Sequence, residues 1–215
     1  MRSSPLHQSL MKDQLTLYVF VSVLFVVGVV FGALLVSALT LDQQQNLAGD
    51  VQQLVARIQA GIGADGAESF WDRVFFHGKW LVLIYVLGLT VVGMPLVLAL
   101  DFLKGVLVGF AVGTLVSQHE WNGLLFSLVS VAPPNLIVVP ALLIASVSAV
   151  SFSLYMVRNR IMGRYGTLGA PFLSHTSTLV TLLLVIAGAA LLEAFVSPGL
   201  LKWAAPLLDG AAGGL

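Results

Sequence analysis

His119-Glu120 is the pair in this sequence that comes closest to a metal-dependent catalytic motif. In the helix of a zinc hydrolase, a second histidine follows the first by four residues, so that both imidazoles face one metal ion. The corresponding position here is Gly123, so the motif fails. The sequence predicts no metal site, because the other histidines also lack ligand spacing; they are His7, His77 and His175.

Other catalytic patterns are also missing from the sequence. The chain contains no cysteine, which excludes disulfides, thiolate metal sites and cysteine nucleophiles. It has neither a Gly-x-Ser-x-Gly nucleophile motif nor a glycine-rich phosphate loop with lysine. We therefore predict that the protein is not an enzyme and uses no cofactor. Four serines cluster in one apolar stretch, where we expect their hydroxyls to bond to their own helix or to a neighbouring one; they are Ser146, Ser148, Ser151 and Ser153.

Asp101 and Lys104 lie three residues apart, where one apolar stretch gives way to the next. An acid at the start of a helix interacts favourably with the positive end of the helix dipole. The two side chains are expected to form a charge pair at the membrane interface. A proton or ion relay is the alternative, since ionisable groups in membrane segments often have functions. Glu193 lies near the end of the last apolar stretch, where its carboxylate is expected to reach water.

The composition indicates what surrounds these side chains. The chain is 58% hydrophobic and only 9% charged, whereas soluble domains carry about 25% charged residues. So few charges cannot make a surface that water solvates, and a lipid bilayer must cover much of it. The formal net charge is zero, which argues against nucleic acid as a partner, because that would need a concentrated basic face.

Five stretches are long and apolar enough to cross a bilayer as helices, which takes about 20 residues each. They are residues 15–41, 79–100, 102–118, 136–157 and 177–196. The predicted fold is all-α: a polytopic helical membrane protein with five transmembrane helices and a short re-entrant or interfacial helix. The predicted organisation is a cytoplasmic N-terminal tail, residues 1–14, and a single membrane domain, residues 15–215.

The predicted connections differ in character. The outer loop, residues 42–78, is the only sizeable polar region, and within it residues 46–60 favour an amphipathic helix. A tight turn is expected around Asp101. Residues 119–135 hold an apolar stretch too short to span a bilayer, which favours a re-entrant or interfacial half-helix. Residues 158–172 are predicted to form a cytoplasmic loop.

Basic residues predict the orientation, because they favour the cytoplasmic side of a membrane. With the N-terminus inside and the C-terminus outside, the inner side carries the larger share of them and few acids. The inner set is Arg2, Lys12, Lys104, Arg158, Arg160 and Arg164, and the outer set is Arg57, Arg73, Lys79 and Lys202.

Glycines recur at four-residue intervals in two of the predicted spans. Such spacing places them on one helix face, where the lack of side chains lets another helix approach closely in lipid. Packing within the chain is the first interpretation, and a homodimer interface is the alternative. The residues are Gly28 and Gly32 in the first span, and Gly105, Gly109 and Gly113 in the third.

Prolines mark the start of the fourth span. Pro133 and Pro134 favour an extended segment before it, and Asn135 is well placed to cap the helix that follows. Pro140 falls inside the first turns, where it removes a backbone hydrogen bond and is expected to act as a hinge or kink. A role in a substrate path would require the freed carbonyls to line a wet cavity.

Several short motifs, in their order and spacing, resemble the stage II sporulation protein M family. The resemblance covers about residues 15–197, including a Phe-Gly-Ala sequence near residue 32, and the family pattern places glycine before Trp121, where this chain has Glu120. The motifs are Gly93-Met-Pro95-Leu, then Phe102-Leu-Lys104-Gly-Val-Leu-Val-Gly-Phe110, then Trp121-Asn-Gly-Leu, and finally Pro133-Pro-Asn135-Leu-Ile-Val-Val-Pro140.

The resemblance implies a role in endospore formation, during engulfment of the forespore. Family members partner sporulation proteins D and P, a lytic transglycosylase and an amidase or endopeptidase that degrade peptidoglycan. The resemblance therefore implies a multi-pass protein of the bacterial cell membrane, in the mother-cell engulfing or septal membrane, that anchors these enzymes. The wider family is also distantly similar to membrane components of ABC exporters.

These observations are compatible with three functions to different degrees. A non-enzymatic scaffold for wall-degrading enzymes agrees best with the missing catalytic motifs and with an outer region too small for an enzyme fold. A permease subunit that pairs with a separate ATPase is the alternative, with the half-helix as a broken helix along a transport path. An intramembrane enzyme ranks last, because no paired catalytic groups lie at matching depth.

Overall fold

The chain is helical almost throughout the residues that the computed structural model describes, which are 5–60, 66–161 and 168–209. The first residues of the predicted N-terminal tail, residues 61–65 of the predicted outer loop and residues 162–167 of the predicted cytoplasmic loop lie outside this description. The helices are α1 (Pro5–Ser37), α2 (Leu41–Gln59), α3 (Gly66–Gly88), α4 (Gly93–Ser130), α5 (Ala132–Ile161), α6 (Gly169–Phe195), α7 (Ser197–Ala204) and α8 (Pro206–Asp209).

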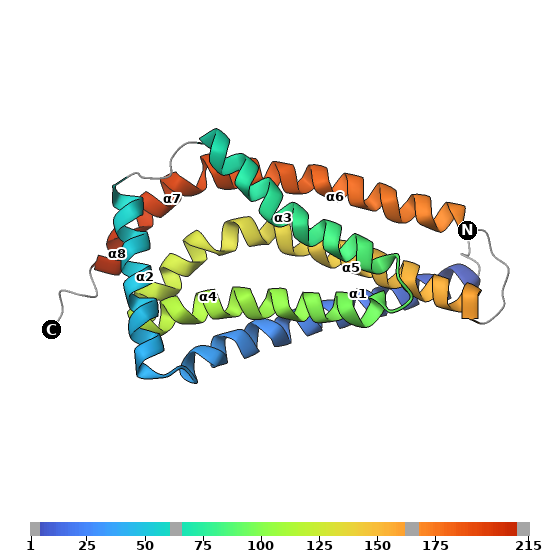
Figure 1. The fold of residues 1–215 in the computed structure, drawn as a ribbon, viewed down its shortest axis with the longest axis horizontal. Coiled ribbons are helices and arrows are strands. Elements are labelled where there is room, and N and C mark those ends of the chain that lie inside the picture. Colours follow the sequence, from blue (N-terminus) through green and yellow to red (C-terminus); the bar gives the residue numbers. More distant parts are fainter. Residues whose placement is uncertain (1–4, 61–65, 162–167, 210–215) are drawn as a thin grey trace.

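The longest helices, α1, α3, α4, α5 and α6, run back and forth between two ends of an elongated bundle (Figure 1). The start of α1, the turn between α3 and α4 and the start of α6 lie at one end. At the other end, α2 crosses the bundle and lies beside α7 and α8, so the start of α1 and the end of α8 lie at opposite ends. Helices suit this composition because, in lipid, each backbone N–H and C=O must find its partner within the segment.

Four of the described helical segments are long and apolar enough to cross a membrane: Gln14–Ser37, Gly93–Ser130, Ala132–Asn159 and Gly169–Phe195. The prediction of an all-α polytopic membrane protein is therefore confirmed, whereas the count of five spans is not. Of the five longest helices, α3 is the one outside this set, and it carries Asp72, Arg73 and Lys79.

The predicted span over residues 79–100 is wrong, because a turn at residues 89–92 divides it. Gly93 closes this turn: a Cβ there would strike the carbonyl of Leu87, and the hydroxyl of Thr90 donates to the same carbonyl at 2.8 Å. Pro95 follows in the first turn of α4, where a helix needs no N–H donor. The residues around the break are themselves apolar, so hydropathy does not reveal it.

The tight turn predicted around Asp101 is wrong as well. Asp101 and Lys104 lie inside α4, well past its start at Gly93, and both side chains are buried. They therefore occupy the interior of a helix rather than the end of a span.

The packing of α1 against α4 is the most extensive helix contact among the described residues. The five glycines with four-residue spacing all lie in it. A Cβ at Gly28 or Gly32 would strike the backbone of α4, and a Cβ at Gly105, Gly109 or Gly113 would strike the backbone of α1. These five glycines therefore pack α1 against α4 within one chain. The homodimer interface that the sequence offered as an alternative stays a prediction.

A sharp reversal divides α4 at Glu120, whose backbone has φ 49° and ψ −124°. After it, the helical residues 121–130 turn back and lead into α5 (Figure 1). Gly123 allows the return, since a Cβ there would strike the carbonyl of Leu115. Residues 119–135 therefore contain a short helix, as predicted, but the model does not test its re-entrant or interfacial location.

The prolines lie differently from the prediction. Pro133 and Pro134 belong to the first turn of α5, which begins at Ala132, so they do not form an extended segment. The amide Nδ2 of Asn135 donates to the carbonyl of Val131 at 2.7 Å, so its side chain serves the junction with α4 rather than accepting from α5 as an N-cap. Pro140 lies inside α5 with its ring exposed.

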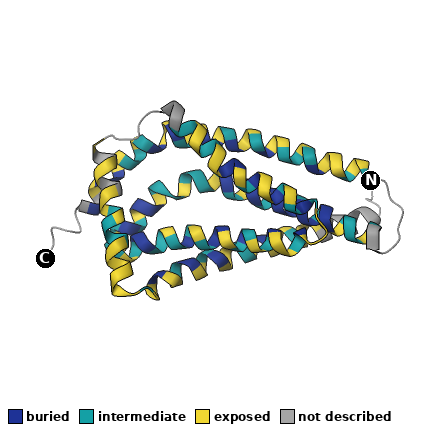
Figure 2. Ribbon diagram, viewed as in Figure 1, coloured by how far each residue is buried: buried dark blue, intermediate teal, exposed yellow. Residues whose placement is uncertain are grey.

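The core lies where α3, α4, α5 and α6 meet, and large apolar side chains cover much of the outside (Figure 2). Successive valines along α1 are exposed on the outside of the bundle. This arrangement suits contact with lipid, which accepts apolar side chains as water does not. The fully buried core includes Leu81, Ile84, Val97, Val138 and Ile186.

Candidate functional site

Ionisable side chains from α3 and α6 meet inside the bundle. The Arg73 guanidinium donates to one carboxylate oxygen of Glu193, and His77 Nε2 lies 3.0 Å from the other. The Glu193 side chain is only 14% exposed. The expectation that this acid reaches water is therefore corrected: it forms an ion pair that ties α6 to α3. Arg73 and His77 stand four residues apart on one helix face, which is the sequence pattern that could have indicated the pair.

Lys104 reaches from α4 toward α3 without a carboxylate partner among the described residues. Its Nζ lies 5.4 Å from the ring centroids of both Phe76 and Trp80. Aromatic faces attract a cation, more strongly where water is excluded. Lys104 is 7% exposed, so this contact with two rings is the principal stabilisation of its charge in the structure.

Asp101 faces α5. The hydroxyl of Ser146 donates to its Oδ1 at 2.7 Å, and its Oδ2 is buried without a hydrogen-bond partner. The ion pairs found among the described residues both involve Glu193, so none joins Asp101 to Lys104. This arrangement differs from the predicted interface pair, because each side chain contacts a different neighbouring helix.

Two of the four serines of α5 bond to neighbouring helices, and a third bonds to the turn between α3 and α4. Ser146 reaches Asp101 on α4, Ser148 reaches His175 on α6, and Ser153 donates to the carbonyl of Thr90 at 2.9 Å. Hydroxyls of this kind join helices in lipid, where apolar contact alone discriminates little between neighbours.

His175 is held on four sides. Its ring stacks between those of Tyr85 and Phe152, with centroids 4.7 and 5.3 Å away. Its Nε2 lies 3.4 Å from the carbonyl of Tyr85, and its Nδ1 lies 2.8 Å from the hydroxyl of Ser148. Because a carbonyl only accepts, these contacts assign the proton to Nε2, so Nδ1 accepts from Ser148. The spacing of these residues along the sequence does not indicate this cluster, because it forms only when α3, α5 and α6 pack together.

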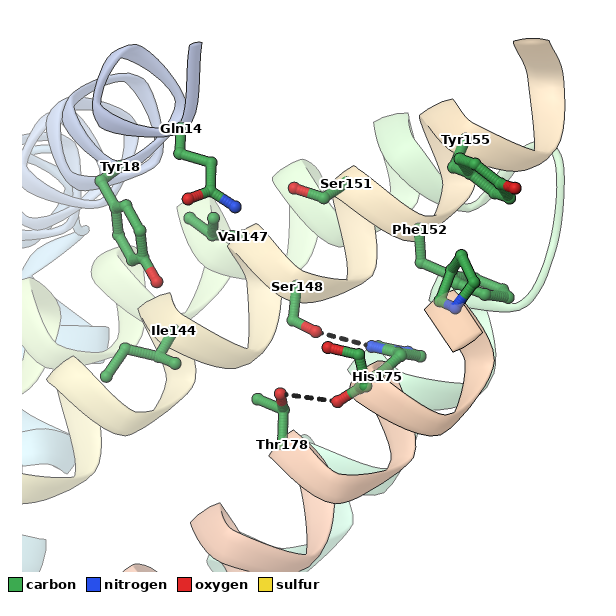
Figure 3. A pocket seen from close by; sticks show the side chains of 12 residues that line it. Gln14, Tyr18, Ile144, Val147, Ser148, Ser151, Phe152, Tyr155, His175 and Thr178 are labelled. Atoms are coloured by element: carbon green, nitrogen blue, oxygen red, sulfur yellow. Dashed lines mark hydrogen bonds between the residues drawn. The ribbon is translucent and has the colours of Figure 1, made fainter. Parts of the chain in front are cut away.

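A groove of about 340 Å³ adjoins His175 and lies between α1, α5 and α6 (Figure 3). The figure shows Gln14 and Tyr18 extending from α1, and Ser148 of α5 bonded to His175 of α6. The lining is rich in hydroxyls and aromatic rings; it also includes Ser151, Phe152, Tyr155, Ser174 and Thr178.

This arrangement offers binding groups rather than catalytic ones. Ser148 and His175 pair a hydroxyl with a base, but Ser148 lies inside α5, where the helix engages the backbone N–H groups that would otherwise stabilise an oxyanion. In the part of the chain that the structure describes, no group of three or more His, Cys, Asp or Glu could hold a metal ion.

Comparison with known proteins matches the chain to a protein family. The family model described as Stage II sporulation protein M matches residues 21–198, which covers the helices from α1 to the start of α7. No curated protein and no solved structure matches the chain.

Proposed function

Because this chain belongs to the stage II sporulation protein M family, we propose that it is a non-enzymatic scaffold that anchors peptidoglycan-degrading enzymes during endospore engulfment. Family membership and the apolar helices suggest a sporulation-related membrane protein. The anchoring role, the partner enzymes and the mother-cell engulfing or septal membrane form the proposal.

The proposed topology has five crossings, with α3 as the additional one. It is supported by the course of α3, which runs alongside α5 and α6 to the turn before α4, and by the start of α1 and the end of α8, which lie at opposite ends of the bundle (Figure 1). In this topology, the N-terminus is inside. The exposed Arg158 at the end of α5 lies at the same end of the bundle, which suits the cytoplasmic side.

One observation supports the anchoring proposal: a small packed platform closes the end of the bundle that is the outer end in the proposed topology. Leu115 and Phe126 of α4 form a core with Ala204 of α7 and Leu208 of α8, and Val51 of α2 packs against it. The platform is folded yet far smaller than an enzyme domain, so it suits a docking surface on the side where the cell wall lies.

The platform also presents groups that suit a protein partner. Asp50, Gln53 and Arg57 follow one another along one face of α2, and all are exposed. Trp121 and Trp203 are 75% and 72% exposed at the same end. Aromatic side chains of this kind are enriched at membrane interfaces and at protein contacts.

Co-purification from sporulating cells tests the proposal. The solubilised protein should retain sporulation proteins D and P, and the double variant Asp50→Arg/Gln53→Arg should lose them. The matched control is Gln45→Arg, a similar change on another side of α2, which should retain them. Recovery of a nucleotide-binding subunit in fixed ratio, without the wall enzymes, would instead establish the permease function.

A further inference from the structure

The groove between α1, α5 and α6 has a feature that anchoring a protein does not explain: it is polar and borders the lipid. Both α1 and α6 pack against α5, but they make no comparable contact with each other. Ile144, Ser148 and Ser151 of α5 therefore form its floor, and α1 and α6 form its walls. A groove built in this way opens sideways between the two walls.

The groove lies at the depth of lipid headgroups. On α1, Gln14 directly follows the charged residues Lys12 and Asp13, and on α5, Tyr155 precedes Arg158 by three residues. Ser174 lies five residues after the start of α6 at Gly169. The ends of spanning helices lie where hydrocarbon meets headgroups, so all three walls place their polar groups at this boundary.

Several polar groups in the groove have no partner in the part of the chain that the structure describes. Neither Gln14, Tyr18 nor Ser151 makes a hydrogen bond there, although each lines the groove. The hydroxyl of Ser148 lies 2.8 Å from His175 Nδ1 and also lines the groove, and its oxygen can still accept a hydrogen bond from an occupant. Polar groups beside hydrocarbon are costly unless something bonds to them, and an occupant with several hydroxyls would satisfy them together.

The lining also selects among headgroups. Among the residues that the structure describes, the lining contains no Lys, Arg, Asp or Glu, whereas phosphate recognition in proteins relies on cationic side chains. The rings of Tyr18 and Phe152 and the hydroxyls of the serines match the two surfaces of a sugar, an apolar C–H face and a hydroxyl edge. The volume of about 340 Å³ falls at the small end of the range of roughly 300–1,000 Å³ for ligand pockets, which suits one sugar unit.

We propose that this groove binds the sugar headgroup of a membrane glycolipid, whose acyl chains leave between α1 and α6. His175, fixed by its stacked neighbours and by Ser148, positions the floor of the groove. The site would tie the protein to membrane regions that contain such a lipid, independently of its protein partners.

Lipid retention by the purified full-length protein tests the proposal. Nanodiscs of phosphatidylcholine would contain either monoglucosyl diacylglycerol or phosphatidylglycerol, and native mass spectrometry would measure the lipid that stays bound. The glucosyl lipid should be retained preferentially. Ser151→Ala and Tyr18→Phe should each weaken retention about ten-fold, which corresponds to one lost hydrogen bond.

The matched control is Ser177→Ala on α6. Ser177 is exposed outside the groove and bonds to the carbonyl of Ser174 in its own helix, so this variant should retain the glucosyl lipid fully. Equal retention by the Ser151→Ala, Tyr18→Phe and unaltered proteins would overturn the assignment of the groove. Preferential retention of phosphatidylglycerol would overturn the sugar, and equally tight binding of free glucose would overturn the lipid.

Discussion

Replacing Glu120 with glycine should stabilise the protein, because the backbone at this residue has a conformation that favours glycine. Glu120 is the one non-glycine residue with positive φ among the described residues. With φ 49° and ψ −124°, it lies outside the regions that a residue with a Cβ readily adopts. The reversal of α4 depends on these angles, so the surrounding structure holds the residue in a strained state.

The magnitude follows from two opposing contributions. Strain of this kind costs about 1–3 kcal/mol, and glycine removes it because it has no Cβ. Glycine in turn loses more backbone freedom on folding, which costs roughly 0.5–1 kcal/mol. The Glu120 side chain is exposed and forms no ion pair among the described residues, so little else is lost. The net gain is about 0.5–2 kcal/mol, equivalent to a rise in Tm of about 1–8 °C for a chain of this size.

Thermal unfolding in detergent, followed by tryptophan fluorescence, measures the effect. Trp121 is adjacent to the substituted residue and reports on the reversal directly. The matched control is Glu120→Ala, which removes the same carboxylate but keeps a Cβ and therefore the strain. A Tm that rises equally with alanine and with glycine would refute the reasoning, since the gain would then come from the lost charge. A lower Tm with glycine would show that this backbone conformation is absent.

Two further substitutions probe the helix contacts. Gly109→Ala should lower the Tm in detergent by several degrees, because the new Cβ would strike the backbone of α1. The control is Gly188→Ala on α6, whose new Cβ meets no neighbour within 4 Å and which should leave the Tm unchanged or raise it. Equal Tm values for the two variants would show that α1 does not pack against α4 at Gly109. Glu193→Gln should destabilise the protein by roughly 1–3 kcal/mol, because it weakens charge-assisted hydrogen bonds to Arg73 and His77, and a double-mutant cycle with Arg73→Gln measures their coupling. Strictly additive effects in that cycle would contradict the ion pair.

Hydropathy predicted segments that are apolar along their whole length. The predicted spans at residues 15–41, 136–157 and 177–196 each overlap a helix that is long and apolar enough to cross a membrane. The sequence also predicted a helix before residue 60, which corresponds to α2. These elements follow from local composition, so a window of residues is sufficient to find them.

The sequence did not predict features that depend on contacts between distant segments. The break at residues 89–92 lies in apolar sequence, and the ion pair that ties α3 to α6 joins Arg73 and His77 to Glu193, more than a hundred residues away. His175 had no visible role, because Tyr85 and Phe152 enclose it only after three helices pack. Glu120 was noticed as a departure from the family pattern, but its backbone angles could not be derived from residue types.

The close seam of glycines between α1 and α4 has a consequence for biogenesis. As the ribosome delivers the chain, α1 reaches the bilayer well before α4 has been synthesised, so it must reside there alone until its neighbour arrives. Its apolar part, Gln14–Ser37, contains no Asp, Glu, Lys or Arg, which allows it to wait in lipid at little cost. In contrast, α4 carries Asp101 and Lys104, and it inserts when α1 is already in place. Trp80, whose ring contacts the Lys104 ammonium group, has then also been synthesised. The order of synthesis therefore places a segment without charged residues in the membrane first, and the segment with Asp101 and Lys104 only when protein can receive it.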